Sequence, residues 1–301
     1  MNAITFNETI KTKVSNILAA RHLDVDVNVE HLTKANGIEY DALTFTGKDM
    51  LQPVVNLNQF FHSYQCHDAD IDDIANDIAD IYEESFLPDD DYKVIFNFEQ
   101  VKNKIFPCLY NTAINSKISD QYIHREYLDL SVYYYVALPI KNDGSGTILI
   151  SRKLLDLWNI SIEELDQTAF NNLHVNKHPQ ITSMYDLFKD ENDEKDISYI
   201  DDLSRNMFIL SCKSDTNGAI YMTDTGILDQ LSSMTSSDLI ILPSSRHELI
   251  VLPSYLMKSH AEINDFRSMV HEVNSTVLRP EDFLSDNVYC YSAEEHELNI
   301  A

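Results

Sequence analysis

One segment limits the possible folds more than any other, because residues 68–85 repeat isoleucines and carboxylates at helical spacing. Ile71, Ile74, Ile78 and Ile81 fall on one side of a helix with about 3.6 residues per turn. A stripe of carboxylates runs parallel to them, about 100° round the axis: Asp70, Asp73, Asp77, Asp80 and Glu84. Like charges four residues apart destabilise an isolated helix. The segment therefore predicts a folded body against which the isoleucines pack.

The rest of the chain alternates hairpins and helices. A helix over 6–18 precedes two strands, 25–29 and 38–45, and residues 94–115 predict a helix followed by an apolar stretch that Pro107 interrupts. Strand, turn, strand and helix then follow each other twice, at 130–158 and at 207–234, before a hairpin at 239–252 and a helix at 263–273. This order predicts an α+β fold of antiparallel hairpins with packed helices.

Two domains are expected from the length of 301 residues. We place a helix, hairpin and helix region at 1–120 and an α+β domain at 121–301, with an acidic loop near 189–202.

Composition narrows the class of protein. A hydrophobic content of 44% is ample for a core, and the formal net charge is -27. Such a surface repels nucleic acid and anionic lipid, so a basic protein surface is the expected partner. Four widely spaced cysteines, the absence of a signal peptide and the absence of a long apolar run favour the cytoplasm. The oligomeric state is left open.

One segment of the sequence contains the residues of a possible nucleophilic catalytic site. Ser244, Ser245, His247 and Glu248 lie together at a predicted hairpin tip, and a hydroxyl, an imidazole and a carboxylate are the groups of acyl transfer. Against catalysis, neighbours on a tight turn point in different directions, and turns favour serine for local reasons. We expect a structural turn, with a hydrolase as the alternative.

Metal and cofactor sites have weaker signals. His62, Cys66 and His67 cluster, and the first two are four residues apart, but no further ligand follows at a familiar spacing. Asn217 and Gly218 are expected to form a hairpin turn. The glycines at 144 and 146 precede a strand, whereas a dinucleotide loop opens into a helix. We expect no metal and no cofactor.

Several segments carry a family resemblance when they are taken in order. They are LDLSVYYYV at 128–136, KSDTNGA at 213–219, ILPSSRHELIVLP at 241–253, VHEVNST at 270–276 and LSDNVY at 284–289. Together they resemble the bacterial domain of unknown function 5688 family, uncharacterised proteins of gut Firmicutes. Arg246 stands where an apolar residue is expected in that pattern. The resemblance implies no activity and no catalytic residue.

Three functions remain open. The sequence favours a non-catalytic cytoplasmic interaction or regulatory protein, because it lacks every strong catalytic, nucleotide or metal motif. The first alternative is an acidic mimic of nucleic acid that binds basic proteins through the stripe at 70–84. The second is a hydrolase that uses the tip at 244–248.

Overall fold

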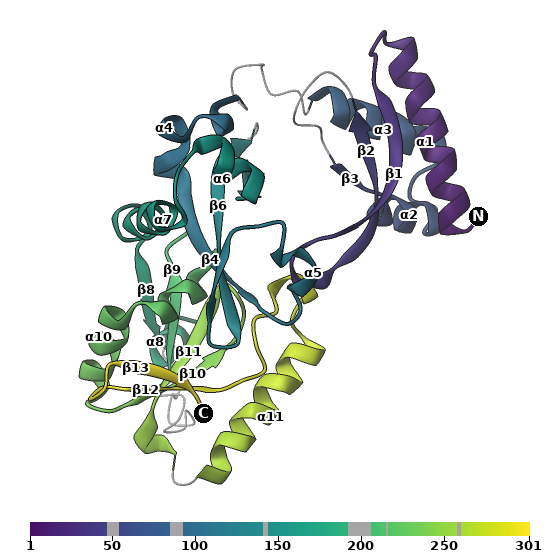
Figure 1. The fold of residues 1–301 in the computed structure, drawn as a ribbon. Helices are drawn as coiled ribbons and strands as arrows, with labels where there is room; N and C mark the ends of the chain where they lie inside the picture. Colours follow the sequence, from purple (N-terminus) through teal and green to yellow (C-terminus); the bar gives the residue numbers. More distant parts are fainter. Residues whose placement is uncertain (47–53, 85–92, 141–143, 192–205, 215, 258–259) are drawn as a thin grey trace. The chain divides into compact units, whose positions relative to one another are not determined.

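The structure is a computed structural model, and it describes most of the chain in two compact units, Met1–Asn97 and Phe98–Ala301 (Figure 1). The described residues are 1–46, 54–84, 93–140, 144–191, 206–214, 216–257 and 260–301.

The described part of the first unit contains a three-stranded antiparallel sheet, three α-helices and two short 3₁₀ helices. Its sheet has the order β1-β2-β3, and Asp26 pairs with Thr46 at one end of the hairpin. The turn between β1 and β2 is a short 3₁₀ helix in which Asn36 has φ 63°, a left-handed value that asparagine tolerates. The elements are α1 (Ala3–Ala20), β1 (Asp26–Thr33), η1 (Ala35–Gly37), β2 (Glu39–Thr46), β3 (Val54–Asn56), α2 (Leu57–Gln65), α3 (Ile71–Glu84) and η2 (Lys93–Phe96).

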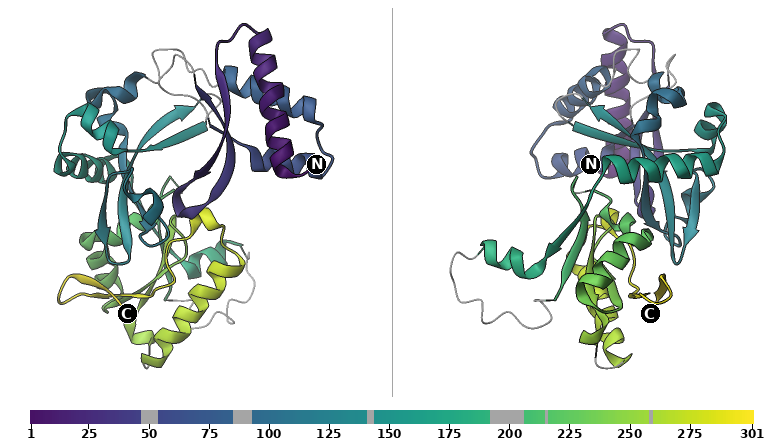
Figure 2. Two further views of the ribbon diagram at one scale, coloured as in Figure 1. Left: turned by 45° about the vertical axis from the view of Figure 1, so that its right-hand side comes forward. Right: turned by 90° about the vertical axis from the view of Figure 1, so that its left-hand side faces the viewer.

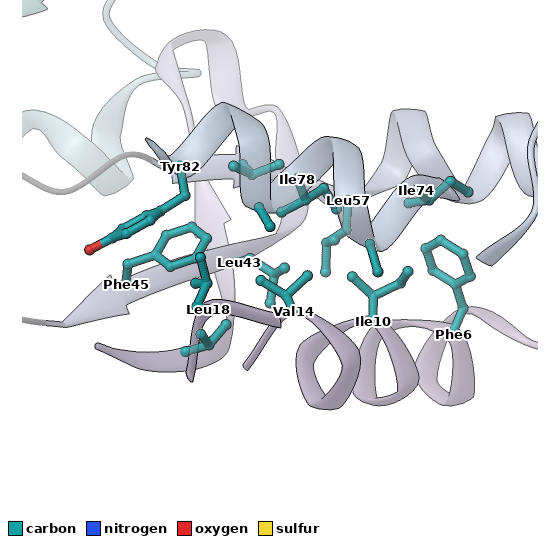
Figure 3. Close-up of a cluster of buried hydrophobic side chains, with 14 residues drawn as sticks. Phe6, Ile10, Val14, Leu18, Leu43, Phe45, Leu57, Ile74, Ile78 and Tyr82 are labelled. Atoms are coloured by element: carbon teal, nitrogen blue, oxygen red, sulfur yellow. The ribbon is translucent and has the colours of Figure 1, made fainter. Parts of the chain in front are cut away.

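The core of the first unit lies between α1, α3 and the sheet, as Figure 3 shows. Phe6, Ile10, Val14 and Leu18 of α1 are completely buried, as their spacing predicts. Ile74 and Ile78 of α3 meet them, together with Leu43, Phe45, Leu57 and Tyr82.

The predicted stripe of α3 is wrong at its end. Ile81 is 38% exposed, whereas Tyr82 is buried against Phe45 with ring centroids 4.5 Å apart. An α-helix has about 3.6 residues per turn, so the residue four positions after Ile78 lies closer to the core-facing side than the residue three positions after it. Tyr82 therefore faces the core. The helix also begins at Ile71 rather than at residue 68, because the Asp70 carboxylate caps it.

The smaller sheet of the second unit is built on β6 (Leu130–Ile140). On one edge of β6 lies β4 (Ile105–Asn111), and on the other lie β5 (His124–Tyr127) and β7 (Gly144–Leu149), each beside a different half of β6. The two strands predicted in the unit at 130–158 are confirmed, because β6 and β7 pair antiparallel. Both faces of β4 and β6 are buried over most of their length.

The prediction of a helix and an interrupted stretch over 94–115 is wrong in its second half. Residues 105–111 form β4, in which Pro107 lies opposite Tyr134. The strand is at the edge of the sheet, where a proline without an N–H costs no ladder bond. In place of the predicted helix, three short helical turns precede β4: η2, α4 (Phe98–Val101) and η3 (Lys102–Lys104).

Two capped helices follow the smaller sheet. Ser151 caps α6 (Arg152–Trp158), and Ser161 caps α7 (Ile162–Asn176) by accepting from the Glu164 amide at 3.1 Å. A serine followed three residues later by glutamate, as in Ser161 and Glu164, predicts the start of a helix, and the structure confirms this start for α7. A buried amide fixes α7 against the sheet, because Asn172 donates to the carbonyl of Ile105 at 2.8 Å.

The larger sheet is entirely antiparallel and has the order β13-β12-β10-β11-β9-β8. Its strands are β8 (Pro179–Ser183), β9 (Phe208–Cys212), β10 (Leu239–Pro243), β11 (Glu248–Pro253), β12 (Tyr289–Ser292) and β13 (Glu297–Ile300). The hairpin predicted at 239–252 is confirmed, with Ile241 opposite Val251. Figure 2 shows this sheet and its helices from two further sides.

The other helical elements described in the second unit are α5 (Ser116–Ser119), α8 (Met184–Glu191), η5 (Gly218–Thr223), α10 (Thr225–Thr235), η6 (Ser254–Leu256), α11 (His260–Thr276) and η7 (Pro280–Asp282). On one face of the larger sheet, Ile263 and Val270 of α11 pack with Ile240, Leu242 and Leu252. The helix predicted at 263–273 is therefore confirmed.

The α+β class is confirmed, but the second strand–turn–strand–helix unit is wrong. Residues 219–222 belong to the 3₁₀ helix η5, although they are as buried as a core strand. Both neighbours of β9 come from elsewhere in the chain, namely β8 and β11.

The two compact units divide between residues 97 and 98, and the expected boundary at 120 falls within the second unit. The predicted boundary separates β4 from β6, and these two strands pair over seven residues from Ile105 to Asn111. Of the predicted acidic loop at 189–202, residues 189–191 end α8 and the remainder lies outside the described residues.

Within the described ranges, the structure contains no helix that is long and apolar enough to cross a membrane.

Candidate functional site

The tip of the β10–β11 hairpin uses its serines to build the turn. Ser244 donates from its hydroxyl to Glu248 Oε1 at 3.1 Å, and the Ser245 amide donates to the Glu248 carbonyl at 3.2 Å. The Ser245 hydroxyl in turn accepts from the His247 amide at 3.0 Å. Ser245 is buried. These bonds are typical of a serine-rich turn.

The imidazole of His247 is bound at both nitrogens by other parts of the chain. Its Nδ1 lies 3.0 Å from the Asn217 amide, which can only donate, so Nδ1 accepts. The proton is therefore on Nε2, which donates to Asp282 Oδ1 at 2.9 Å. A histidine that acts as general base for a serine must have a ring nitrogen free to accept the proton of the serine hydroxyl. The predicted grouping of Ser244, Ser245 and His247 thus lacks the Ser–His bond of acyl transfer.

Asn217 and Gly218 lie against the hairpin tip, but they begin η5 instead of joining two strands. Asn217 has φ 58° and donates its amide to His247. Gly218 leaves no room for a side chain, because a Cβ atom there would lie 2.4 Å from the His247 carbonyl oxygen and 2.5 Å from the Cys212 amide nitrogen. The absence of a side chain at Gly218 therefore allows three backbone segments to pack closely together.

Arg246 points to the smaller sheet, where it covers a tyrosine. Its guanidinium carbon lies 4.9 Å from the centre of the Tyr110 ring, and Nη1 donates to the Tyr110 hydroxyl at 2.5 Å. The Arg246 amide also donates to the Asp282 carbonyl at 2.9 Å. The position expected to be apolar therefore holds a cation that joins the hairpin to β4.

Tyr110 and Cys108 are held in their neutral forms. Burial raises the pKa of Tyr110, and burial raises the pKa of the Cys108 thiol to about 12. Sequence reasoning missed both groups. The available signal was strand alternation, which places residues 106, 108 and 110 on the same face of β4. A thiol and a phenol in these states are poor nucleophiles.

A second polar cluster surrounds Asp129, which sequence reasoning also missed. Tyr289 donates to Oδ1 at 2.7 Å, and Ser285 and Asn287 donate to Oδ2 at 2.6 and 2.9 Å. The residue before it, Leu128, has φ 56°, an uncommon left-handed conformation for leucine. The carboxylate thus binds the first residue of β12 and two residues of the segment before it.

Polar residues of α11 contact the same segment and not the hairpin tip. Asn274 donates to the Ser285 carbonyl at 3.0 Å and to Asp286 Oδ1 at 2.8 Å. His271 Nδ1 lies 3.1 Å from Asp286 Oδ2. The segments 128–136, 270–276 and 284–289 therefore meet at one location, while 217–218 and 244–248 meet at another.

The acidic stripe of α3 is partly engaged within its own unit. Asp70 accepts from the amides of Asp72 and Asp73, and Asp80 accepts from Arg21 at 2.7 Å. Asp73 and Asp77 are exposed. The Glu84 side chain lies outside the described part of the structure.

The candidate metal ligands come together only in part. Cys66 Sγ lies 3.8 Å from His62 Nε2, one turn earlier in the chain. His67 follows with φ 60°, where the chain leaves α2. Among the residues that the structure describes, no group of three or more His, Cys, Asp or Glu side chains is placed to hold a metal ion.

The fold and its polar clusters define an acidic α+β protein in which the segments of the family resemblance hold the second unit together. A family model described as "Family of unknown function (DUF5688)" matches residues 4–293, so the chain belongs to this family. No curated protein and no solved structure matches the chain.

Proposed function

We propose that this chain is a non-catalytic cytoplasmic protein, of bacterial origin, that acts by binding a basic protein partner. The observation that carries this proposal is the state of His247. Both of its nitrogens are bound within the chain, so the imidazole at the serine-rich tip supports a structural role. A hydrolase would need Ser244 or Ser245 to reach that imidazole.

Charge defines the chemistry of the partner. The net charge of -27 favours cationic surfaces and disfavours nucleic acid and anionic lipid. Such attraction accelerates encounter more than it strengthens the final complex, and salt screens it over about 8 Å at physiological ionic strength. A partner would therefore be recognised first by its charge and then by closer contacts.

The nucleic-acid mimic has less support than a general interaction protein. Duplex DNA presents about one charge per 1.7 Å of axis in a regular array. On α3, Asp80 is bound to Arg21 and Asp70 is used as a cap, which interrupts the row of carboxylates. Lys13 of α1 also pairs with Asp72, and Arg21, the residue that follows α1, also pairs with Glu83.

The proposal can be tested with a lysine-rich peptide and a serine-reactive fluorophosphonate probe. We expect fluorescence anisotropy to show binding of the peptide to the full chain, with an affinity that falls as salt is added. A glutamate-rich peptide of the same length is the control and should not bind. Intact-mass analysis should show no labelling of Ser244 or Ser245. Stoichiometric labelling of either serine, or no binding of the lysine-rich peptide at low salt, would overturn the proposal.

A further inference from the structure

The outer face of α11 carries an apolar line that the larger sheet does not cover. Met269, Val273 and Val277 are 50%, 42% and 78% exposed. They follow one another at intervals of four residues, the first two within α11 and the third directly after its last residue. Residues four apart lie on one side of a helix, drifting by about 40° per step. We call these three residues the α11 line.

The α11 line is distinct from the face of α11 that packs on the sheet. Ile263, Phe266 and Val270 contact the core with Ile240 and Val288. The helix therefore has a core-facing apolar side and a neighbouring, solvent-facing one. Figures 1 and 2 show α11 at the margin of the second unit. Contiguous exposed apolar side chains with polar neighbours are typical of a binding surface.

Carboxylates lie beside the line, while the cationic groups of α11 point elsewhere. Asp265 is four residues before Met269 and Glu272 is three residues after it, so both lie on the flank of the α11 line next to Met269; both are exposed. Arg267 donates to the Ala301 carbonyl at 2.6 Å and to Asn264 at 3.1 Å, away from this face.

The remaining charged groups on α11 do not place a positive charge beside the α11 line. His271 is bound to Asp286 on the opposite side of the helix from Met269. Glu262 is the acidic residue of the first turn. Among the described side chains of α11, those that border the line are therefore acidic or neutral.

We propose that this face of α11 binds an amphipathic helix of a partner protein, with apolar residues against the α11 line and lysine or arginine beside Asp265 and Glu272. The inference rests on the proposed function and specifies where and how a basic partner is recognised. A second copy of the chain fits this face less well, because it would bring the same carboxylates opposite one another. A partner helix that docks in this way presents apolar anchors at i, i+3, i+4 and i+7 on its own sequence.

The probe is a synthetic peptide of lysine and leucine with leucines on one helical face, compared with a scrambled peptide of equal composition. The full chain should bind the amphipathic peptide at least tenfold more tightly than the scrambled one. The double variant Met269→Gln and Val273→Gln should remove this difference. Val175→Gln in α7, an exposed valine at 71%, is the matched control and should leave it within twofold.

A second pair of variants separates local from overall charge. Asp265→Asn with Glu272→Gln should weaken binding of the amphipathic peptide at least fivefold. Asp73→Asn with Asp77→Asn removes the same charge from α3 and should weaken it less than twofold. Unchanged urea midpoints in all variants, and shifted NMR amide signals at 269–277 on addition of the peptide, support a local effect.

The outcomes separate the two proposals. If both peptides bind equally and the α11 variants change nothing, the α11 face is not the binding surface, while a basic partner still stands. If neither peptide binds at low salt, both proposals fail. A concentration-dependent dimer that the Met269 and Val273 double variant dissolves would assign the face to a second copy and overturn the inference.

Discussion

His247 and Asp282 are joined by a hydrogen bond of 2.9 Å between Nε2 and Oδ1, although 35 residues separate them in the chain. The bond ties the hairpin tip to η7, and the Asn217 amide on the other nitrogen ties it to η5. One imidazole therefore links three segments of the second unit. Its contribution should appear in stability rather than in catalysis.

Replacing His247 by alanine should lower the free energy of unfolding by about 1 to 3 kcal/mol, because a partly buried amide and a carboxylate each lose a partner. Urea denaturation followed by circular dichroism measures the loss. Ser244→Ala removes a single bond to Glu248 at the same tip and should cost less than about 1 kcal/mol. Equal effects of the two variants would contradict the linking role of His247.

Gly218→Ala should prevent normal folding or destabilise the protein by more than about 3 kcal/mol, since backbone atoms at 2.4 and 2.5 Å cannot make room for a methyl group. Gly226→Ala is the control. Its Cβ atom would meet only the Asp224 carboxylate, at 3.3 Å, in the first turn of α10. There the better helix propensity of alanine offsets the contact, so we expect a change within about 1 kcal/mol. Soluble yield and thermal melting distinguish the two variants.

Asp129→Asn should cost about 2 to 4 kcal/mol, because one of the three donors from Ser285, Asn287 and Tyr289 would then face an amide NH₂ group. Glu126→Gln, on the exposed side of β5, removes a nearby charge and should stay within about 0.5 kcal/mol. The difference between their urea midpoints is the measurement. A loss in Asp129→Asn no larger than in the control would show that the cluster contributes little.

Native cysteines should differ in reactivity toward Ellman's reagent. Cys66 is exposed and should react first, whereas Cys108 and Cys212 are buried and should react only on unfolding. With its pKa raised to about 12, Cys108 has only about one thiolate in ten thousand molecules near pH 8. Peptide mapping after timed modification identifies each site. Cys66→Ser should remove the fast phase, and rapid labelling of Cys108 in folded protein would contradict its burial.

The sequence predicted those elements whose position depends on residues close together in the chain. Four-residue periodicity located α1 and most of α3, and Ser161 located the start of α7, because caps and amphipathic faces involve neighbours in the chain. The strand β4 was missed because Pro107 is acceptable only at a sheet edge, and edge position is a tertiary property. Residues 219–222 were predicted as a strand because they form a short apolar run. A buried 3₁₀ helix such as η5 has the same pattern as a core strand, so the sequence cannot distinguish the two.

The polar clusters could not be predicted for a related reason. Asp129 binds Ser285, Asn287 and Tyr289 from at least 156 residues away, and no spacing rule connects such positions. The hairpin at 239–252 did place Ser244, Ser245 and His247 at one tip. The direction of each side chain, however, depended on Asn217 and Asp282, which approach from other elements.

The strand order of the larger sheet has a consequence during translation. β10 lies between β11 and β12, and β12 is made only at residues 289–292. While the ribosome is still adding those residues, one edge of a very apolar strand has no neighbour, and open edges of this kind promote aggregation. Residues 1–97 contain all three strands of their own sheet and can complete it much earlier in synthesis. A nascent chain stalled before residue 289 should therefore depend on chaperones for its second unit but not for its first.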